Sequence, residues 1–145
     1  MKKFTLLLLI VLTAMTLMAC GGTKKEEAYR KAAKSFVQNV NKIGAEIDSL
    51  DATDPASGEA LLDLLGQMND EFRKFSKVEA PKKYKSCQAK SKDAYSHMNS
   101  ALSLYQQLYH GAAYDSSIWQ NAHDEYSTAM TAIRELGSDI MNKSN

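Results

Sequence analysis

The chain has 145 residues, which is enough for one domain of ordinary size and too few for two. It contains only 7 glycines and 2 prolines, about half the average share of these residues, which disfavours a loop-rich β-sandwich, a collagenous repeat or a disordered Pro/Gly-rich chain. The 18 basic and 17 acidic side chains nearly balance, so no excess positive charge is available for nucleic-acid binding. We therefore predict long helices and no nucleic-acid partner.

The first twenty residues have the pattern of an export signal. Two lysines precede an uncharged stretch of 16 residues, which is shorter than the roughly 20 needed for a membrane-spanning helix. The stretch leads into the run Leu17-Met18-Ala19-Cys20, in which a branched apolar residue, a variable position and a small residue precede a cysteine. This run resembles the lipobox of bacterial lipoproteins. The resemblance implies that residues 1–19 are a signal peptide.

The lipobox resemblance further implies that the Cys20 thiol carries a diacylglyceryl group. Two acyl chains anchor a protein stably where a single chain does not, so the membrane is expected to be a partner through the lipid on Cys20. The chain would be exported and held on the outer face of the cytoplasmic membrane, or on the outer membrane of a Gram-negative cell. Residues 20–25 would form the lipidated cysteine and tether, and residues 26–145 a helical bundle domain. The alternative is an ordinary secreted protein with a coincidental cysteine.

After the tether, hydrophobic residues recur every three or four positions, which is the period of an amphipathic helix. Four segments show this pattern, and each has one continuous apolar face. The residues of these faces are Tyr29, Ala33, Phe36, Val40, Ile43, Ile47 and Leu50; Leu61, Leu65, Met68, Phe72 and Phe75; Tyr84, Cys87, Ser91, Ala94, Met98, Ala101, Tyr105 and Leu108; and Trp119, Ala122, Tyr126, Ala129, Ile133, Leu136 and Ile140.

The links between the segments are short. Asp54 and Pro55 predict an N-cap followed by a proline in the first turn of the second helix, and Pro81 predicts the end of that helix. Because short links make consecutive helices antiparallel, the predicted fold is all-α, an up-down-up-down antiparallel four-helix bundle. A three-helix coil with the second and third segments fused ranks second, because it would place Pro81 inside a helix at a cost of about 3 kcal/mol.

Glycines and polar residues mark the remaining boundaries. Gly111 is expected to take the left-handed C-cap position after the third helix, and Asp115, or Ser117 with Gln120, to open the fourth. Three other glycines lie inside predicted helices and indicate either close helix approach or weak points in the helices. They are Gly44, Gly66 and Gly137.

The sequence carries no motif for a reaction. It has no Glu-x-x-His pair, no Cys-x-x-Cys-His, no Gly-x-Ser-x-Gly and no glycine-rich phosphate loop. A metal site at Asp93, His97 and His123 is disfavoured, because the two histidines would differ in height by about 9 Å. Cys87 lies on an apolar face and is expected to fill space, with a mixed disulfide as the alternative. We predict no enzyme, no metal and no cofactor.

In such a bundle the charges separate by end. One end, called here the basic end, holds the start of the first helix, the Pro81 turn and the C-terminus. The expectation is either that it rests on anionic headgroups or that its charges are merely solvated. It accounts for 14 of the 16 basic residues that follow Cys20: Lys24, Lys25, Arg30, Lys31, Lys34, Arg73, Lys74, Lys77, Lys82, Lys83, Lys85, Lys90, Lys92 and Lys143.

The opposite end, called here the aromatic end, is acidic and gathers large rings. Tyr105, Tyr109, Tyr114 and Trp119 either contact a partner or ligand or close the end of the core. We interpret the chain as a non-enzymatic binding or scaffold lipoprotein for a protein partner at the cell envelope. The alternative function is a small-ligand carrier whose pocket lies between helices near the aromatic end.

Overall fold

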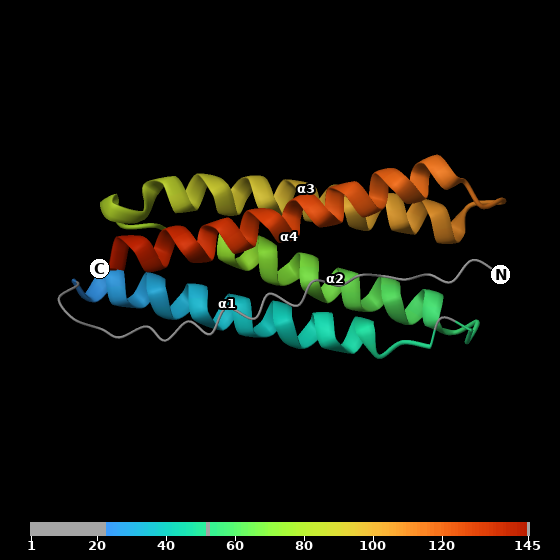
Figure 1. Cartoon of the computed structure of the whole chain (residues 1–145), viewed down its shortest axis with the longest axis horizontal. Coiled ribbons are helices and arrows are strands. Elements are labelled where there is room, and N and C mark those ends of the chain that lie inside the picture. The colour runs from blue at the N-terminus through green and yellow to red at the C-terminus, as the bar shows by residue number, and fades with distance from the viewer. Residues whose placement is uncertain (1–22, 52, 145) are drawn as a thin grey trace.

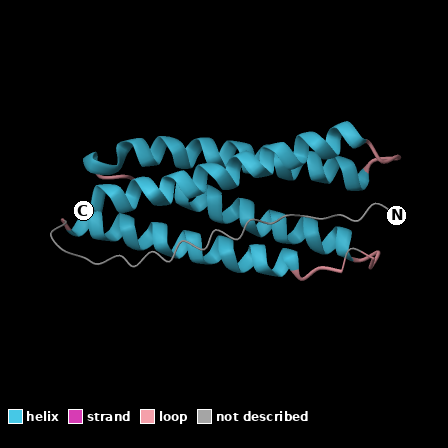
Figure 2. Cartoon of the chain, viewed as in Figure 1, coloured by secondary structure: helices cyan, strands magenta, loops and turns pink. Residues whose placement is uncertain are grey.

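The computed structural model describes residues 23–51 and 53–144, and four long helices make up most of them. The helices are α1 (Lys24–Asp48), α2 (Ser57–Ser76), α3 (Lys85–His110) and α4 (Ser116–Ser144), with a short 3-10 helix, η1 (Lys82–Tyr84), before α3. No strand occurs in this described part of the chain (Figure 2). The predicted all-α class is confirmed. The predicted signal peptide and Cys20 lie outside the described residues.

Consecutive helices run in opposite directions along a common axis (Figure 1). The start of α1, the link between α2 and α3, and the end of α4 lie together at the basic end, and the other two links lie together at the aromatic end. This is the up-down-up-down bundle that the sequence predicts. Helices α3 and α4 pack against each other most extensively, whereas α1 packs mainly on α2 and approaches α4 at few points. Among the described helices, none is long and apolar enough to cross a membrane.

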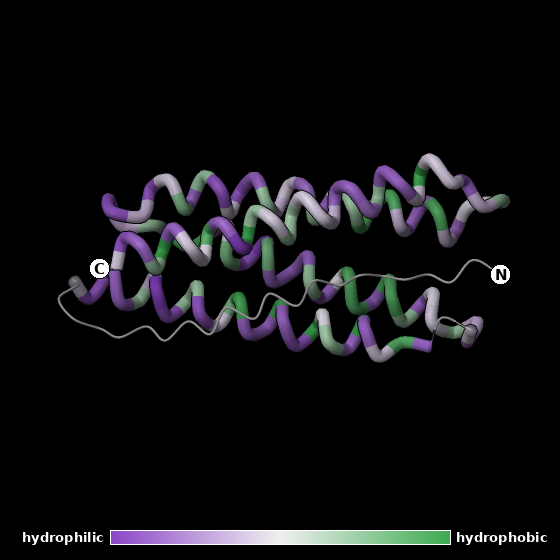
Figure 3. Tube along the Cα trace, viewed as in Figure 1, coloured by the Kyte–Doolittle hydropathy of each residue, from purple (hydrophilic) through white to green (hydrophobic). Residues whose placement is uncertain are grey.

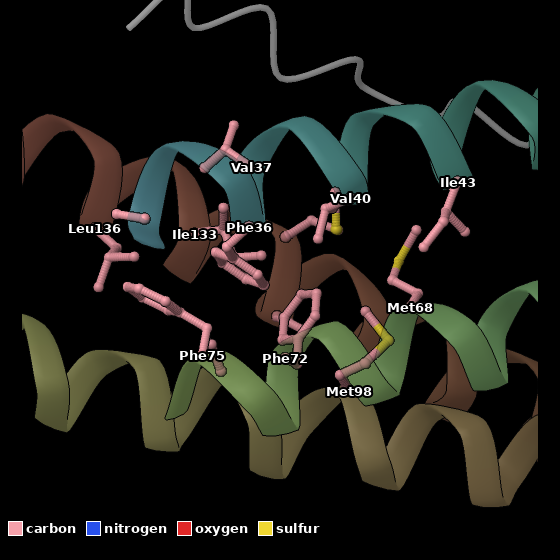
Figure 4. Close-up of a cluster of buried hydrophobic side chains, with 14 of the residues drawn as sticks. Phe36, Val37, Val40, Ile43, Met68, Phe72, Phe75, Met98, Ile133 and Leu136 are labelled. Atoms are coloured by element: carbon pink, nitrogen blue, oxygen red, sulfur yellow. The ribbon is translucent and has the colours of Figure 1, made fainter. Parts of the chain in front are cut away.

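The predicted apolar faces form one core that runs the length of the bundle. Hydrophobic positions alternate with hydrophilic ones along every helix (Figure 3). Figure 4 shows how Phe36 lies between the side chains of Phe72 and Phe75. The Phe36 ring stacks on Phe75 at a centroid distance of 4.7 Å and meets Phe72 edge-on at 5.3 Å. Burial of each such side chain contributes about 1.5–3 kcal/mol, so the helices owe their stability mainly to this core.

Tyrosines close the core at the basic end. The Tyr29 ring stacks on Tyr84 at 5.3 Å and lies 5.6 Å from Phe75, so η1 is fastened to α1 and α2. The Tyr84 hydroxyl lies 3.2 Å from Ser144 Oγ in the last turn of α4. The four helices are therefore held together at this end.

The beginning of α2 differs from the prediction. The helix starts at Ser57, and Asp54 is not its N-cap. Instead the Asp54 carboxylate accepts a hydrogen bond from the Ala56 amide at 2.9 Å, and the Ser57 amide donates to the Asp54 carbonyl at 3.0 Å. The acidic segment thus forms a separate turn before the helix, and Pro55 lies in that turn. By contrast Asp115 caps α4 as expected, accepting from the Ser117 amide at 2.8 Å.

Two of the glycine predictions are corrected. Gly111 follows the last residue of α3, but its φ of −72° and ψ of 157° are extended, so the expected left-handed cap is wrong. A side chain is excluded there for another reason: a Cβ would lie 2.8 Å from the Gln107 carbonyl oxygen. Close helix approach is also wrong for Gly66, because a Cβ at that position would meet nothing within 4 Å. Gly44 and Gly137 are buried.

Candidate interaction site at the aromatic end

A hollow lies where α3 ends and the chain turns toward α4. Its volume is about 270 Å³, and it is lined by Leu108, Tyr109, Gly111, Ala112, Ala113 and Tyr114. Tyr109 and Tyr114 are the large hydrophobic side chains that the described residues leave exposed, at 44% and 64%. Both belong to this one hollow. Tyrosine is a residue type that dominates binding energy at protein interfaces, so the pair marks a candidate contact site.

The position of Tyr109 depends on a glycine in another helix. A Cβ on Gly58, in the first turn of α2, would lie 2.8 Å from Cε1 of the Tyr109 ring. The ring therefore packs directly on the α2 backbone, and this contact joins the α1–α2 link to the end of α3. The sequence alone does not indicate this contact of Gly58, because a glycine near a helix start carries no sign of a partner some fifty positions away.

The other two predicted aromatic residues lie elsewhere. Tyr105 is 4% exposed and belongs to the core, and burial together with the neighbouring Tyr109 raises its pKa to about 12. Trp119 is half-buried on α4, where its ring stacks on His123 at 5.4 Å. Neither residue lines the hollow. Of the four predicted residues, Tyr105 closes the core and Trp119 packs half-buried against His123, while Tyr109 and Tyr114 are exposed together.

Several carboxylates lie at the same end of the bundle as the hollow. Asp115 directly follows Tyr114, and hydrogen bonds from the Ser117 hydroxyl, the Ser117 amide and the Ile118 amide lower its pKa. Glu59, in the first turn of α2, lies 4.0 Å from His110 at the end of α3. Bonds from the Thr53 hydroxyl and amide likewise lower the pKa of Asp51. The end of the bundle that carries the exposed tyrosines is therefore also acidic, and polar residues beside an aromatic centre resemble the rim and core of a protein interface.

The remaining candidate residues make structural contacts. Cys87 is fully buried, and burial, reinforced by the charge of Asp139, raises its thiol pKa, so the reactive thiolate is disfavoured. His97 Nδ1 lies 2.6 Å from a Glu125 oxygen and joins α3 to α4. No group of three or more His, Cys, Asp or Glu side chains that could hold a metal occurs within residues 23–51 and 53–144.

A second hollow, of about 260 Å³, lies between α1 and α2. Its charged groups all have partners. Glu71 accepts from Asn39 and from Lys74, both at 2.7 Å, Lys42 lies 4.0 Å from Glu46, and Asp70 pairs with Arg73 at 2.8 Å. Such a set leaves no charge uncompensated for a ligand, so we regard the hollow as part of the α1–α2 contact. Its lining residues are Asn39, Lys42, Ile43, Glu46, Gln67, Asp70, Glu71 and Lys74.

The fold and the site define a class, that of small helical-bundle domains with exposed tyrosines at one end. The chain belongs to a family described as a domain of unknown function, DUF7018. The family model matches residues 23–136, which is more than three quarters of the chain. The match begins at Thr23, the residue that caps α1. Comparison with curated proteins and with solved structures found no match to this chain.

Proposed function

We propose that this protein is a membrane-anchored bacterial lipoprotein that binds a protein partner at the cell envelope and catalyses no reaction. One observation supports this most: Tyr109 and Tyr114, the exposed large hydrophobic side chains of the described residues, line a single hollow at one end of the bundle. Exposed rings gathered at one place are typical of contact surfaces, and scattered ones are not.

The proposed anchor lies at the opposite end. Cys20 precedes the first residue of α1, Lys24, by four positions, and α1 begins at the basic end. The aromatic end would therefore point away from the membrane, where a partner can reach it. With α3 spanning 26 residues, the two ends are separated by about 39 Å at 1.5 Å rise per residue.

A small-ligand carrier receives less support. Ligand pockets usually enclose about 300–1,000 Å³ and bury most of their ligand. The hollow at the aromatic end measures about 270 Å³, and all of its lining residues except the half-buried Leu108 are exposed. Tyr105, which a pocket running into the core would expose, is buried.

The anchor is tested by metabolic labelling with an alkyne fatty acid. We expect Cys20→Ser to abolish labelling, because a serine hydroxyl lacks the acidity and nucleophilicity of a thiol. Cys87→Ala is the matched control, since it removes the only other cysteine and should leave the label in place. Label retained by Cys20→Ser would refute the lipoprotein assignment.

The contact site is tested by photocrosslinking in intact cells. A photoreactive residue at Ala113, in the hollow, should give a discrete adduct, and one at the exposed Ala89 on α3 should not. The crosslinked protein is then purified and its direct binding measured. Tyr114→Ala should weaken that binding at least tenfold and change the free energy of unfolding by less than about 0.5 kcal/mol.

A pair of glycine substitutions tests whether the position of the Tyr109 ring matters for binding, without removing any aromatic side chain. Gly58→Ala should displace the Tyr109 ring, which can shift because it is partly exposed, and so weaken binding without removing an aromatic residue. Gly66→Ala makes the same change in the same helix with no contact, and should leave binding intact. Equal binding by wild type, Tyr114→Ala and Gly58→Ala would eliminate the proposed site.

A further inference from the structure

Lysines crowd the basic end of the bundle without partners. Seven of its lysines lie in the outermost turns, at the tip of this end. None of these seven forms an ion pair within residues 23–51 and 53–144, and all are exposed except the half-buried Lys143. The acidic residues near them are Glu26, Glu27, Glu79 and Asp139, so this tip carries net positive charge. The seven are Lys24, Lys25, Lys77, Lys82, Lys83, Lys85 and Lys143.

Three basic residues farther from this end are paired, whereas the exposed Lys31, Lys34, Lys92 and Arg134 form no ion pair within the described residues. Arg73 lies 2.8 Å from Asp70, and Lys74 lies 2.7 Å from Glu71. Lys90 on α3 bridges to Asp139 on α4 at 2.8 Å. Arg73, Lys74 and Lys90 thus take part in ion pairs, whereas none of the seven lysines at the tip of the basic end does.

The lysines around the start of α3 also oppose its helix dipole. Lys82 and Lys83 form η1 and Lys85 is the first residue of α3, where the partial charge of the helix is positive and acidic residues are favoured. The first turn of α3 contains no acidic residue, and its N-cap Tyr84 makes no side-chain capping bond. These three lysines therefore destabilise the helix that carries them. Departures from local rules without structural compensation are typical of functional sites.

Chain connectivity brings these lysines close to the proposed anchor at Cys20. Four peptide units separate Cys20 from Lys24, so their Cα atoms can be at most about 14 Å apart. The turn that carries Lys82 and Lys83 lies at the same end as Lys24 (Figure 1). A lipid on Cys20 would hold the surface within one or two Debye lengths of the bilayer, where electrostatic attraction acts.

From the unpaired lysines, their opposition to the helix dipole and their place beside Lys24, we infer that the basic end is a docking surface for anionic phospholipid headgroups. Docking would set the bundle upright with the aromatic end outermost. This inference rests on the proposed lipid anchor at Cys20 and requires nothing of the aromatic hollow.

The test uses the lipidated chain purified from membranes and reconstituted into vesicles of phosphatidylcholine with or without phosphatidylglycerol. Acetylation of each lysine is followed by mass spectrometry. On phosphatidylglycerol vesicles we expect Lys82 and Lys83 to react at least about fivefold more slowly than on phosphatidylcholine alone. In about 1 M salt, where the Debye length is about 3 Å, the difference should vanish. Lys42, near the aromatic end, is the internal control and should react equally on both.

Two double variants with the same change in net charge sharpen the test. Lys82→Glu with Lys83→Glu should restore fast acetylation of Lys24 and Lys77 on phosphatidylglycerol. Lys42→Glu with Arg134→Glu should leave them protected. Equal acetylation of the wild type on both vesicle types, or protection that survives Lys82→Glu with Lys83→Glu, would overturn the docking surface.

The intact mass of the purified chain distinguishes failure of the docking surface from failure of the lipid anchor. If the purified chain carries no lipid mass, the anchor proposal is wrong, and the same chain is sedimented with the two vesicle types. Co-sedimentation with phosphatidylglycerol vesicles alone would still support the surface, and its absence would overturn it.

Discussion

Arg30 is a charged side chain inside the bundle. It is only 4% exposed, and its Nη2 has no hydrogen-bond partner within the described residues. Removing a guanidinium from water is costly unless partners replace the lost hydration. Arg30 therefore opposes folding, even though its three methylene groups can pack like an apolar side chain.

We expect Arg30→Met to raise the free energy of unfolding by about 1 kcal/mol, because the apolar stem is kept and the buried charge is removed. Urea unfolding measures the change. Arg73→Met, at an exposed position paired with Asp70, is the control and should shift stability by less than about 0.5 kcal/mol. A clear loss of stability in Arg30→Met would show that the guanidinium is satisfied in solution.

The environment of Glu71 leads us to expect that its contribution to the free energy of unfolding decreases at low pH. Burial opposes its charge, but hydrogen bonds from Asn39 and Lys74 and the charge of Lys74 lower its pKa below the ordinary 4.5. Because the folded state has the lower pKa, this stabilisation is complete above pH 4.5 and is lost as the pH falls through the folded value. Glu71→Gln should therefore cost about 1 kcal/mol at pH 7 and much less at pH 3. An equal cost at both pH values, measured by urea unfolding, would contradict this.

Arg30 and Gly58 mark the limit of what the residues alone predict. A pattern of apolar positions treats every arginine as a surface residue, so it cannot show that Arg30 lies on the buried side of α1. The contact of Gly58 with Tyr109 joins two helices, and no local rule connects them. Of the candidate site, the sequence indicated Tyr109 and Tyr114, but it could not separate them from the buried Tyr105.

At the scale of the helix, periodicity was sufficient to predict the elements. Each predicted apolar face is buried over its central positions. Apolar residues spaced three and four apart lie on one side of a helix, so they are removed from water together when that side packs against the other helices. The ends were harder to predict. The Asp54 carboxylate accepts a hydrogen bond within a turn instead of capping α2. Gly111 adopts an extended conformation, in which a Cβ would clash with the carbonyl oxygen of Gln107. Competition between a cap and a turn is decided by tertiary contacts.

Gly66 is a weak point of α2 that can be repaired. A Cβ there would meet nothing within 4 Å, so alanine adds no clash and removes the entropy that glycine loses in a helix. Gly66→Ala should raise the free energy of unfolding by about 0.5–1 kcal/mol. Chemical denaturation measures it, with Gly58→Ala as the matched comparison, in which the Tyr109 ring must shift. Destabilisation by Gly66→Ala would show that α2 bends or packs there.

At the scale of the molecule, one core serves all four helices. Ala129 on α4 is fully buried and belongs to this core. Ala129→Asp should cost at least about 3–5 kcal/mol, because it places an unpaired charge among apolar groups, and that is comparable to the whole stability of a small domain. Loss of the helical circular-dichroism signal is expected, whereas Ser127→Asp on the exposed side of α4 should keep it. An unchanged melt for Ala129→Asp would refute the bundle.

The placement of the chain ends has a mechanical consequence. Thr23 and Ser144 lie at one end of the bundle and the α3–α4 link at the other (Figure 1). A load between a membrane anchor and a partner at Ala112 pulls along the helix axes and shears many contacts at once. A load between Thr23 and Ser144 instead peels α1 from α2 and α4 from α3 one turn at a time. In optical tweezers, handles at positions 23 and 112 should withstand a higher force than handles at 23 and 144, so the direction in which the proposed anchor and partner pull is the one in which the bundle is strongest.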